Sequence, residues 1–187
     1  MDTKASSVTD MIKKLSDKKL LIYKKYQGVR LSNGGKKIAV ATVRKHRLWE
    51  SFLVEKLHFN WDEVHDIAEQ LEHIKSEALI NRLEAYLGYP KVDPHGDPIP
   101  DKNGNITQQE ILPLSALTEN DKTYLIALKD TNDDFLKYLN SKKLAIGTAI
   151  TVEKIEPYDG SIEIETPHGK FLITSETAKN LLVKEPN

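Results

Sequence analysis

The chain has 187 residues, of which 39% are hydrophobic, and this length is enough for one or two domains with a buried core. It contains no cysteine, which excludes disulfides, thiolate zinc sites and cysteine nucleophiles. No apolar run approaches the roughly 20 residues of a membrane helix, and the first residues lack the apolar stretch of a secretion signal. We therefore expect a cytoplasmic protein that does not contact the membrane.

The net charge of −1 conceals a strong asymmetry along the chain. Residues 1–47 contain 13 Lys or Arg and three Asp, a net charge of +10, whereas the rest contains 14 basic and 25 acidic residues, a net charge of −11. A basic end joined to an acidic body is typical of a protein with a nucleic-acid-binding segment. The alternative is a lysine-rich helix and turn that are merely solvated.

The basic end contains a predicted helix and a predicted hairpin. Apolar residues recur at three- and four-residue spacing from Val8 to Leu15, which predicts a short amphipathic helix over residues 5–18. Residues 20–32 are typical of two short strands around a turn that contains Gly28. A helix followed by a basic hairpin is the second half of a winged helix-turn-helix, in which the helix enters the major groove and the wing contacts phosphate.

The middle of the chain is predicted to be helical. The pair Gly34 and Gly35 indicates a break before a long helix over residues 36–57. Two or three further helices are expected within residues 62–87, where Gly and Pro are scarce. Residues 88–120 are rich in Pro, Gly, Asp and Asn, a composition that predicts a linker.

After the predicted linker the pattern changes to short strands separated by turns. Closely spaced short strands predict a small β-barrel. The expected strands are residues 123–129, 147–156, 160–166 and 169–174, with a helix over residues 133–142 between the first two.

Two imidazoles and three carboxylates crowd into residues 65–73, the sequence HDIAEQLEH. At helical spacing four of these donors share one stripe: His65, Glu69, Glu72 and His73. His46 and Glu50 form a second pair, four residues apart on the preceding long helix. Antiparallel packing of the two helices would bring all the donors together as a divalent-metal site. The alternative is an ordinary charged face exposed to solvent.

Enzymatic chemistry finds little support in the motifs. A carboxylate-bridged di-iron bundle needs Glu-x-x-His on two helices, and residues 55–58 provide a single copy. There is no His-Glu-x-x-His motif and no phosphate-binding glycine loop. An EF-hand loop starting at Asp101 would need Gly and Glu where the chain has Ile106 and Leu112. We expect a protein that is not an enzyme; a carboxylate-bridged metalloenzyme and a dimeric interaction module without metal sensing are the alternatives.

Taken together, four stretches resemble the diphtheria toxin repressor family of metal-dependent transcriptional repressors, which includes manganese-transport regulators. They are residues 5–39, 43–53, 64–73 and 93–100, in the family's order. The resemblance implies a mainly α protein with a small β-barrel of the SH3-like, FeoA-like type. The family's winged helix begins with two further helices, so the chain is expected to correspond to a member without them. The implied parts are a partial winged helix-turn-helix (1–35), a helical metal-binding and dimerisation domain (36–90), a linker (91–120) and the barrel (121–187).

The resemblance also implies two metal sites. The manganese-type primary site would use His46, Glu69, Glu72 and His73. The second site would use Glu50, with His65 as an option, together with Asp93, His95 and an acidic residue of the barrel domain, either Asp134 or Asp133. Iron-sensing members have cysteine at the position of Glu69, and a site of carboxylates and imidazoles without thiolate suits Mn²⁺. We therefore expect Mn²⁺, with Fe²⁺ as second choice.

The implied function is a metal-dependent, DNA-binding transcriptional repressor that controls metal-ion homeostasis. Metal binding would favour a homodimer that reads a palindromic operator in double-stranded DNA. The residues expected to face DNA are Ser6, Ser7, Thr9 and Lys13 on the helix, and Lys24, Lys25, Tyr26 and Gln27 in the wing.

Overall fold

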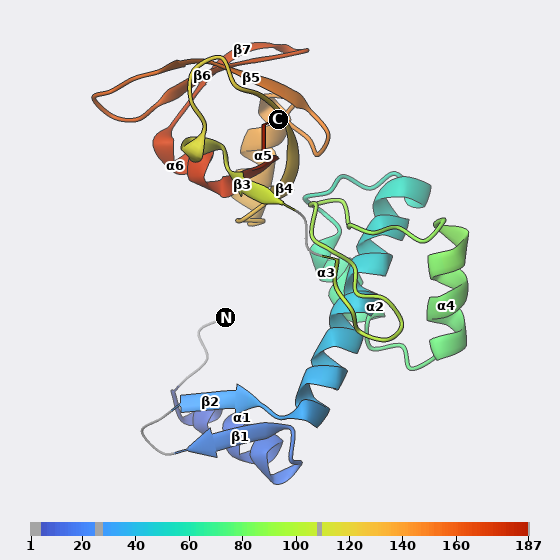
Figure 1. Ribbon diagram of the computed structural model, residues 1–187. Coiled ribbons are helices and arrows are strands. Elements are labelled where there is room, and N and C mark those ends of the chain that lie inside the picture. Colours follow the sequence, from blue (N-terminus) through green and yellow to red (C-terminus); the bar gives the residue numbers. More distant parts are fainter. Residues whose placement is uncertain (1–4, 25–27, 108–109, 187) are drawn as a thin grey trace.

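The computed structural model of the chain describes residues 5–24, 28–107 and 110–186, which form three parts (Figure 1). A small N-terminal unit of one helix and one hairpin is joined by the long helix α2 to a helical domain. A domain built on a β-sheet follows and lies against one end of the helical domain. None of the helices described is both long and apolar enough to cross a bilayer.

The N-terminal unit consists of α1 (Ala5–Asp17), β1 (Leu21–Lys24) and β2 (Gly28–Leu31). The two strands pair antiparallel, with Leu21 opposite Leu31. The predicted helix and hairpin are thus confirmed, while the turn between the strands lies outside the described residues. None of the described residues from 7 to 34 is buried, so this unit has no hydrophobic core of its own.

Helix α2 (Asn33–Leu57) begins earlier than predicted, and the break expected at Gly34 and Gly35 was wrong. Ser32 caps the helix, because its side chain accepts a hydrogen bond from the Gly35 amide at 3.0 Å. A Cβ atom at residue 35 would lie 2.1 Å from the carbonyl oxygen of Leu20, so glycine is required for the contact between helix and hairpin. The glycine signals close packing here and not the end of an element.

Two further helices complete the helical domain: α3 (His65–Leu71) and α4 (Glu77–Tyr86). They pack on α2 through a buried apolar cluster that consists mainly of Leu48, Leu53, Val64, Ala68, Ile80 and Leu83. Arg44 of α2 binds α4 through Glu84, 2.7 Å away, and Asn81, 3.2 Å away. These contacts fix the orientation of α2 within the domain.

The sheet domain contains six antiparallel strands in the order β3-β8-β4-β5-β6-β7. The strands are β3 (Ile111–Pro113), β4 (Lys122–Leu128), β5 (Ala149–Ile155), β6 (Ile162–Thr166), β7 (Gly169–Ile173) and β8 (Leu181–Lys184). Helices α5 (Asp133–Ser141) and α6 (Ser175–Asn180) and the short 3-10 helix η1 (Leu114–Ala116) complete the domain. The four predicted strands and α5 are confirmed, whereas β3, β8 and α6 were missed. Among the described residues the edge strands β3 and β7 do not pair, so the small barrel is an open, curled sheet.

The region without helix or strand is shorter than the predicted linker, and part of it is buried against the two domains. The last residues of the predicted linker form β3 and η1 of the sheet domain. Within it, Val92 pairs with Pro98, and both Asp93 and His95 are buried. The Asp93 side chain accepts backbone hydrogen bonds from His95 at 2.8 Å and Asp97 at 3.0 Å. Pro, Gly and Asp therefore build a rigid turn at this point and not a flexible tether.

Candidate metal centre

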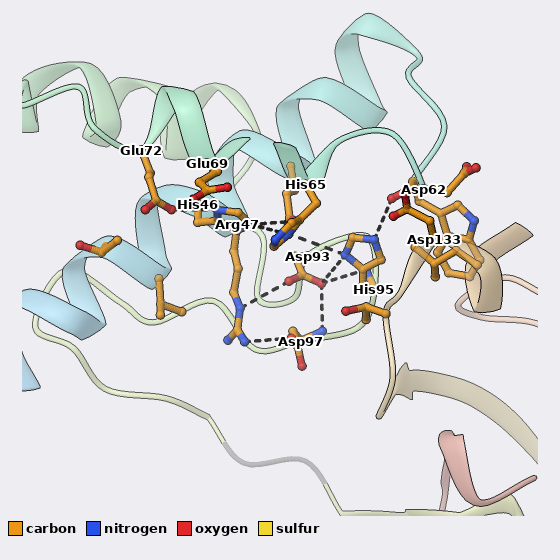
Figure 2. A pocket seen from close by; sticks show the side chains of 16 residues that line it. His46, Arg47, Asp62, His65, Glu69, Glu72, Asp93, His95, Asp97 and Asp133 are labelled. Atoms are coloured by element: carbon orange, nitrogen blue, oxygen red, sulfur yellow. Dashed lines mark hydrogen bonds and ion pairs between the residues drawn. The ribbon is translucent and has the colours of Figure 1, made fainter. Parts of the chain in front are cut away.

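A polar pocket lies where α2, α3, the turn of residues 93–98 and the start of α5 meet (Figure 2). Its volume is about 360 Å³. The histidine and acidic side chains on its walls, which are of the types that can bind a metal ion, are His46, Glu50, His65, Glu69, Glu72, Asp93, His95 and Asp133, together with Asp62 and Asp97. Four separate segments of the chain thus supply donors to one hollow.

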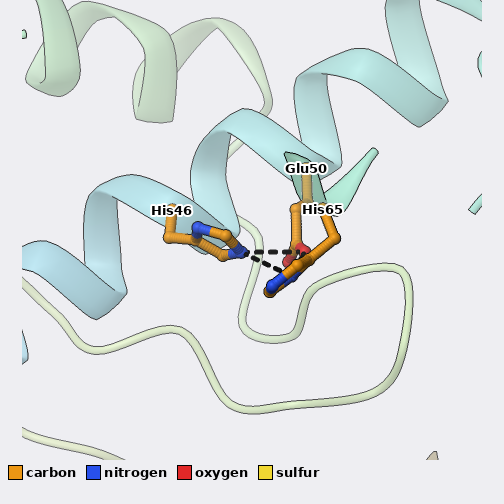
Figure 3. Close-up of side chains that lie close together, drawn as sticks. All are labelled: His46, Glu50 and His65. Carbon is orange, nitrogen blue, oxygen red and sulfur yellow. Dashed lines mark hydrogen bonds and ion pairs between the residues drawn. The ribbon is translucent and has the colours of Figure 1, made fainter. Parts of the chain in front are cut away.

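One group of potential ligands consists of His46, Glu50 and His65, with one ligand atom of each within 4.8 Å of the others (Figure 3). His46 Nε2 lies 3.0 Å from Glu50 Oε1 and 3.2 Å from His65 Nδ1. The other ring nitrogen of His46 lies 2.8 Å from a carboxylate oxygen of Glu72. Since a carboxylate only accepts, Nδ1–H of His46 donates to Glu72 and Nε2–H donates to Glu50 when the ring is protonated. A metal ion bound at Nε2 would take the place of that second hydrogen, with Nδ1–H still held by Glu72.

A second group consists of Glu50, Asp93 and His95, all of them buried. His95 Nδ1 lies 3.9 Å from Glu50 Oε2 and 4.0 Å from Asp93 Oδ1, distances beyond a direct hydrogen bond. Glu50 is 3% exposed and belongs to both groups, offering Oε1 to one and Oε2 to the other. The two groups are therefore adjacent and share a carboxylate.

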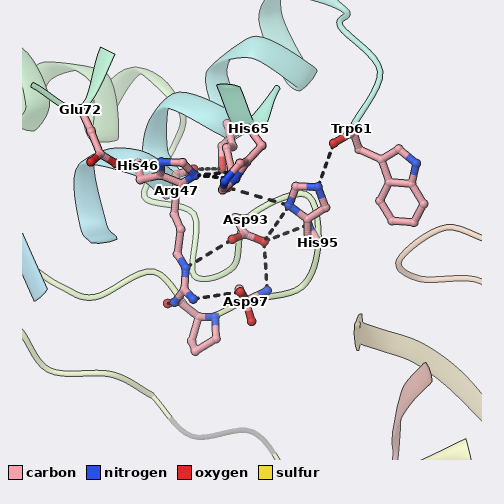
Figure 4. A network of polar contacts seen from close by, with 11 residues as sticks. His46, Arg47, Trp61, His65, Glu72, Asp93, His95 and Asp97 are labelled. Carbon is pink, nitrogen blue, oxygen red and sulfur yellow. Dashed lines mark hydrogen bonds and ion pairs between the residues drawn. The ribbon is translucent and has the colours of Figure 1, made fainter. Parts of the chain in front are cut away.

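Arg47 holds the turn of residues 93–98 against α2 (Figure 4). Its guanidinium lies 3.4 Å from Asp93 and 2.9 Å from Asp97, and it donates to the Pro98 carbonyl at 2.5 Å. This contact fixes the backbone on which Asp93 and His95 are presented to Glu50.

The surroundings in the pocket raise the pKa values of some side chains and lower that of another. Burial lowers the pKa of His46, but the hydrogen bonds and negative charges of Glu50 and Glu72 outweigh it, so this pKa is raised above 6.5. Burial raises the pKa of Glu50, but the imidazoles around it, His46 above all, hold this pKa below its usual value. For Asp93, burial and the charges of Glu50 and Asp97 raise the pKa to about 7. A bound divalent cation would offset the repulsion among these carboxylates.

The sequence-predicted ligands fall into three sets. The structure brings five of them together in the two groups: His46, Glu50, His65, Asp93 and His95. Glu69 and Glu72 line the same pocket, whereas His73 is exposed and is not among its lining residues. The predicted stripe assumed a helix that continues through residue 73, but α3 ends at Leu71. The role of each residue as a ligand stays a prediction.

In the sheet domain it is Asp133, and not Asp134, that lines the pocket. Both residues occupy the first turn of α5, where neighbouring side chains point about 100° apart. Arg47, Asp62 and Asp97 also line the pocket and were missed. Asp97 lies within residues 93–100, one of the stretches that resemble the repressor family, so its place in the same short segment as Asp93 was the available signal.

The structure describes only some of the residues that are expected to face DNA. Ser7, Thr9 and Lys13 on α1 and Lys24 at the end of β1 are exposed. The side chain of Ser6, and all of Lys25, Tyr26 and Gln27, lie outside the described residues. Three of the basic side chains in residues 1–47 make contacts within the protein. Arg44 binds Glu84, Lys45 donates to the Glu72 carbonyl, and Arg47 binds Asp93 and Asp97.

The donor set fits a divalent first-row metal ion. Imidazole and carboxylate are ligands of Mn²⁺, Fe²⁺ and Zn²⁺. The ring nitrogen of His46 and that of His95 that would not bind the ion each have an oxygen partner, Glu72 for His46 and the Trp61 carbonyl for His95. Fold and pocket together define a metal-binding helical domain with an appended sheet domain.

Comparison with known families agrees with this description. Residues 32–101 match the metal-binding and dimerisation domain of the iron-dependent repressors, and residues 112–185 match the FeoA domain. Among solved structures, a manganese-dependent transcriptional repressor in complex with manganese superposes with a TM-score of 0.86 and 33% identity. The match covers 98% of this chain and 86% of that one. The chain belongs to the family of metal-dependent transcriptional repressors, whose members are regulators and not enzymes, and the resemblance seen in the sequence is confirmed.

The curated relatives match over shorter stretches. The iron-dependent repressor IdeR of Mycobacterium tuberculosis is 34% identical over 100 residues, which are 54% of this chain and 44% of that protein. A probable metal transport system membrane protein of Chlamydia trachomatis is 46% identical over 70 residues, 37% of this chain and 16% of that protein. The matched part of the chain thus spans less than half the length of either relative.

Proposed function

We propose that the chain is a metal-dependent repressor of transcription that controls metal-ion homeostasis, and that Mn²⁺ bound in the pocket favours its DNA-binding form. The observation that carries this proposal is the pair of ligand groups that share Glu50 between α2, α3 and the turn of residues 93–98. The similarity to a manganese-dependent repressor in complex with manganese supports it.

The first ion would be held by His46, Glu50 and His65, and the second by Glu50, Asp93 and His95. Glu69, Glu72 and Asp133 line the same pocket and could supply further carboxylate oxygens. The cation would supply positive charge and a fixed coordination geometry that link the two helices and the turn. Arg47 keeps the turn in place, and the Glu72 carboxylate orients the ring of His46.

Metal binding would act through linkage between two conformations. Helix α2 carries His46 and Glu50 in its middle and contacts the hairpin at its first turn, through Gly35 and Leu20. A change in the orientation of α2 would therefore move the N-terminal unit as well. The ion shifts this equilibrium only as far as it binds one conformation more tightly than the other.

We propose Mn²⁺ as the cognate ion, with Fe²⁺ as second choice. Every potential ligand in the pocket is an imidazole or a carboxylate, and Glu69 supplies an oxygen where iron-sensing relatives have cysteine. Hard oxygen ligands suit Mn²⁺, although the intrinsic affinity order favours later metals.

The proposed partner is double-stranded DNA with a palindromic operator, bound by a homodimer in the cytoplasm. The N-terminal unit presents exposed cations from both of its elements, including Lys13 and Lys14 of α1, Lys24 of β1 and Arg30 of β2. Such side chains neutralise phosphates and position the protein, while base contacts supply sequence preference.

The test compares Glu50→Gln with Glu55→Gln on the same helix, where Glu55 lies outside the pocket. Thermal unfolding is followed during Mn²⁺ titration, and each protein then selects from a random double-stranded DNA library with and without Mn²⁺. We expect Mn²⁺ to raise the Tm and to enrich inverted repeats for the parent and Glu55→Gln, and neither for Glu50→Gln. An equal response of both variants, or none in the parent, would contradict the proposal.

A further inference from the structure

Trp61 comes from the loop between α2 and α3, yet its side chain packs in the core of the sheet domain. It is 9% exposed and belongs to the same apolar cluster as Leu136 and Leu139 of α5. Its indole Nε1–H donates to Asn140 Oδ1 at 2.7 Å, and the Asn140 amide donates to Asp62 at 3.2 Å. Two hydrogen bonds from α5 therefore hold residues 61 and 62 of the helical domain.

The backbone of the same residue orients His95. The carbonyl oxygen of Trp61 lies 2.8 Å from His95 Nε2, and the indole and imidazole rings stack with a centroid distance of 5.9 Å (Figure 4). Because a carbonyl only accepts, Nε2 carries the hydrogen, and in the neutral ring the lone pair lies on Nδ1. That atom faces Glu50 and Asp93 at 3.9 and 4.0 Å.

Strand β4 of the sheet domain holds His95 from another side. The Leu128 amide donates to the His95 carbonyl at 3.1 Å. Gly96 has φ of +87°, and a Cβ atom there would lie 2.0 Å from the carbonyl oxygen of Ile126. The backbone at residues 95–96 therefore touches β4 directly.

We propose that Trp61 and Asn140 are positioning residues that connect the sheet domain to the second ligand group. The Asn140–Trp61 hydrogen bond sets the position of the Trp61 carbonyl, which keeps His95 in its Nε2–H tautomer with Nδ1 toward Glu50 and Asp93. The sheet domain thus shapes the metal site without itself having to supply a ligand. The inference rests on the proposed function only where it takes Nδ1 as a ligand, since the tautomer exists without metal.

The experiment uses Trp61→Phe and Asn140→Ala, each of which removes the hydrogen bond between the two side chains. Trp49→Phe is the matched control, because Trp49 is also buried and its Nε1 has no hydrogen-bond partner among the described residues. The tautomer of His95 is read in the metal-free proteins by long-range ¹H–¹⁵N NMR, which distinguishes the Nδ1–H ring, the Nε2–H ring and the imidazolium from one another. His95→Gln assigns the signal, and calorimetric titration with Mn²⁺ measures affinity.

We expect the parent and Trp49→Phe to show only the Nε2–H form of His95, and both test variants to show a mixture of tautomers. In the test variants the Mn²⁺ affinity of the Glu50, Asp93 and His95 group should fall about fivefold, as for the loss of one hydrogen bond. An unchanged tautomer with unchanged affinity would overturn the proposal. Asn140 is exposed, so Asn140→Ala keeps the test valid even if Trp61→Phe does not fold. If neither the parent nor any variant bound Mn²⁺, but the tautomer of His95 still changed in the two test variants, the positioning role of Trp61 and Asn140 would stand. The proposed function would then fail.

Discussion

At the scale of single residues, Glu50 is the centre of the site. It is nearly fully buried, its two oxygens face different ligand groups, and the imidazoles around it stabilise its charge. A buried carboxylate among three imidazoles is costly unless its charge is paired, so this arrangement is more than a solvated face. The solvated-face alternative applies better to His73, which is exposed.

Asp93 should make the metal-free protein less stable as pH rises toward neutrality. Its pKa is about 7 in the folded protein, against an ordinary value of 3.8, so between these values the folded state binds more protons than the unfolded state. The free energy of unfolding then falls with increasing pH, and this contribution is lost as pH passes about 7. Asp93→Asn should show a shallower fall than the parent in urea unfolding at pH values between ~4 and ~8. Parallel curves would contradict the shifted pKa.

Glu69 should determine the preference among metal ions. Glu69→Cys replaces an oxygen donor of the pocket by a thiolate, which binds later and softer metals better. We expect the ratio of Fe²⁺ to Mn²⁺ affinity to rise about tenfold in competitive titration. Glu63→Cys, outside the pocket, is the control, and an equal change in both variants would exclude this role.

At the scale of elements, the sequence pattern predicted the helices other than α6, the N-terminal hairpin and four strands of the sheet, because these elements carry their signals locally. It failed where tertiary contacts decide. The start of α2 was missed because Gly35 is there for its contact with Leu20, and the segment around Asp93 was taken as a linker although its turn is buried. For the same reason the donors on α2 and α3 could be predicted from spacing, whereas the role of Arg47 in holding the turn could not.

Gly35 and Gly34 form a matched pair for testing the junction between hairpin and α2. Gly35→Ala forces a Cβ atom against the Leu20 carbonyl and should cost about 1–3 kcal/mol of local stability. At residue 34 the nearest atom to a Cβ is 3.7 Å away, so Gly34→Ala should be neutral or stabilise the helix by about 0.5–1 kcal/mol. Hydrogen exchange of the β1 and β2 amides measures the effect. Equal exchange in the two variants would show that this contact does not hold the hairpin.

At the scale of the whole molecule, the metal pocket lies where the helical domain, the packed turn and the sheet domain meet. Residues 61–62 and 95–96 of the helical side contact α5 and β4 of the sheet side. Long α2 connects the same pocket to the N-terminal unit. A cation bound at this place would therefore act on all three parts.

Gly96→Ala should separate the sheet domain from the pocket. Its Cβ would overlap the backbone of β4, whereas Gly88, which also has a positive φ, has open space around it. Both variants bear the same strain of a left-handed residue, so their difference isolates the contact. We expect Gly96→Ala to increase protease cleavage between the domains and to weaken Mn²⁺ binding, and Gly88→Ala to do neither. Identical behaviour would contradict a role for the domain contact.

The most direct test of the central claim is anomalous scattering at the manganese absorption edge from crystals grown with Mn²⁺. We expect two neighbouring peaks in the pocket. One should lie among His46 Nε2, Glu50 and His65 Nδ1, and the other among Glu50, Asp93 and His95 Nδ1. An ordered manganese bound elsewhere, or a pocket without any anomalous peak at saturating Mn²⁺, would contradict the account.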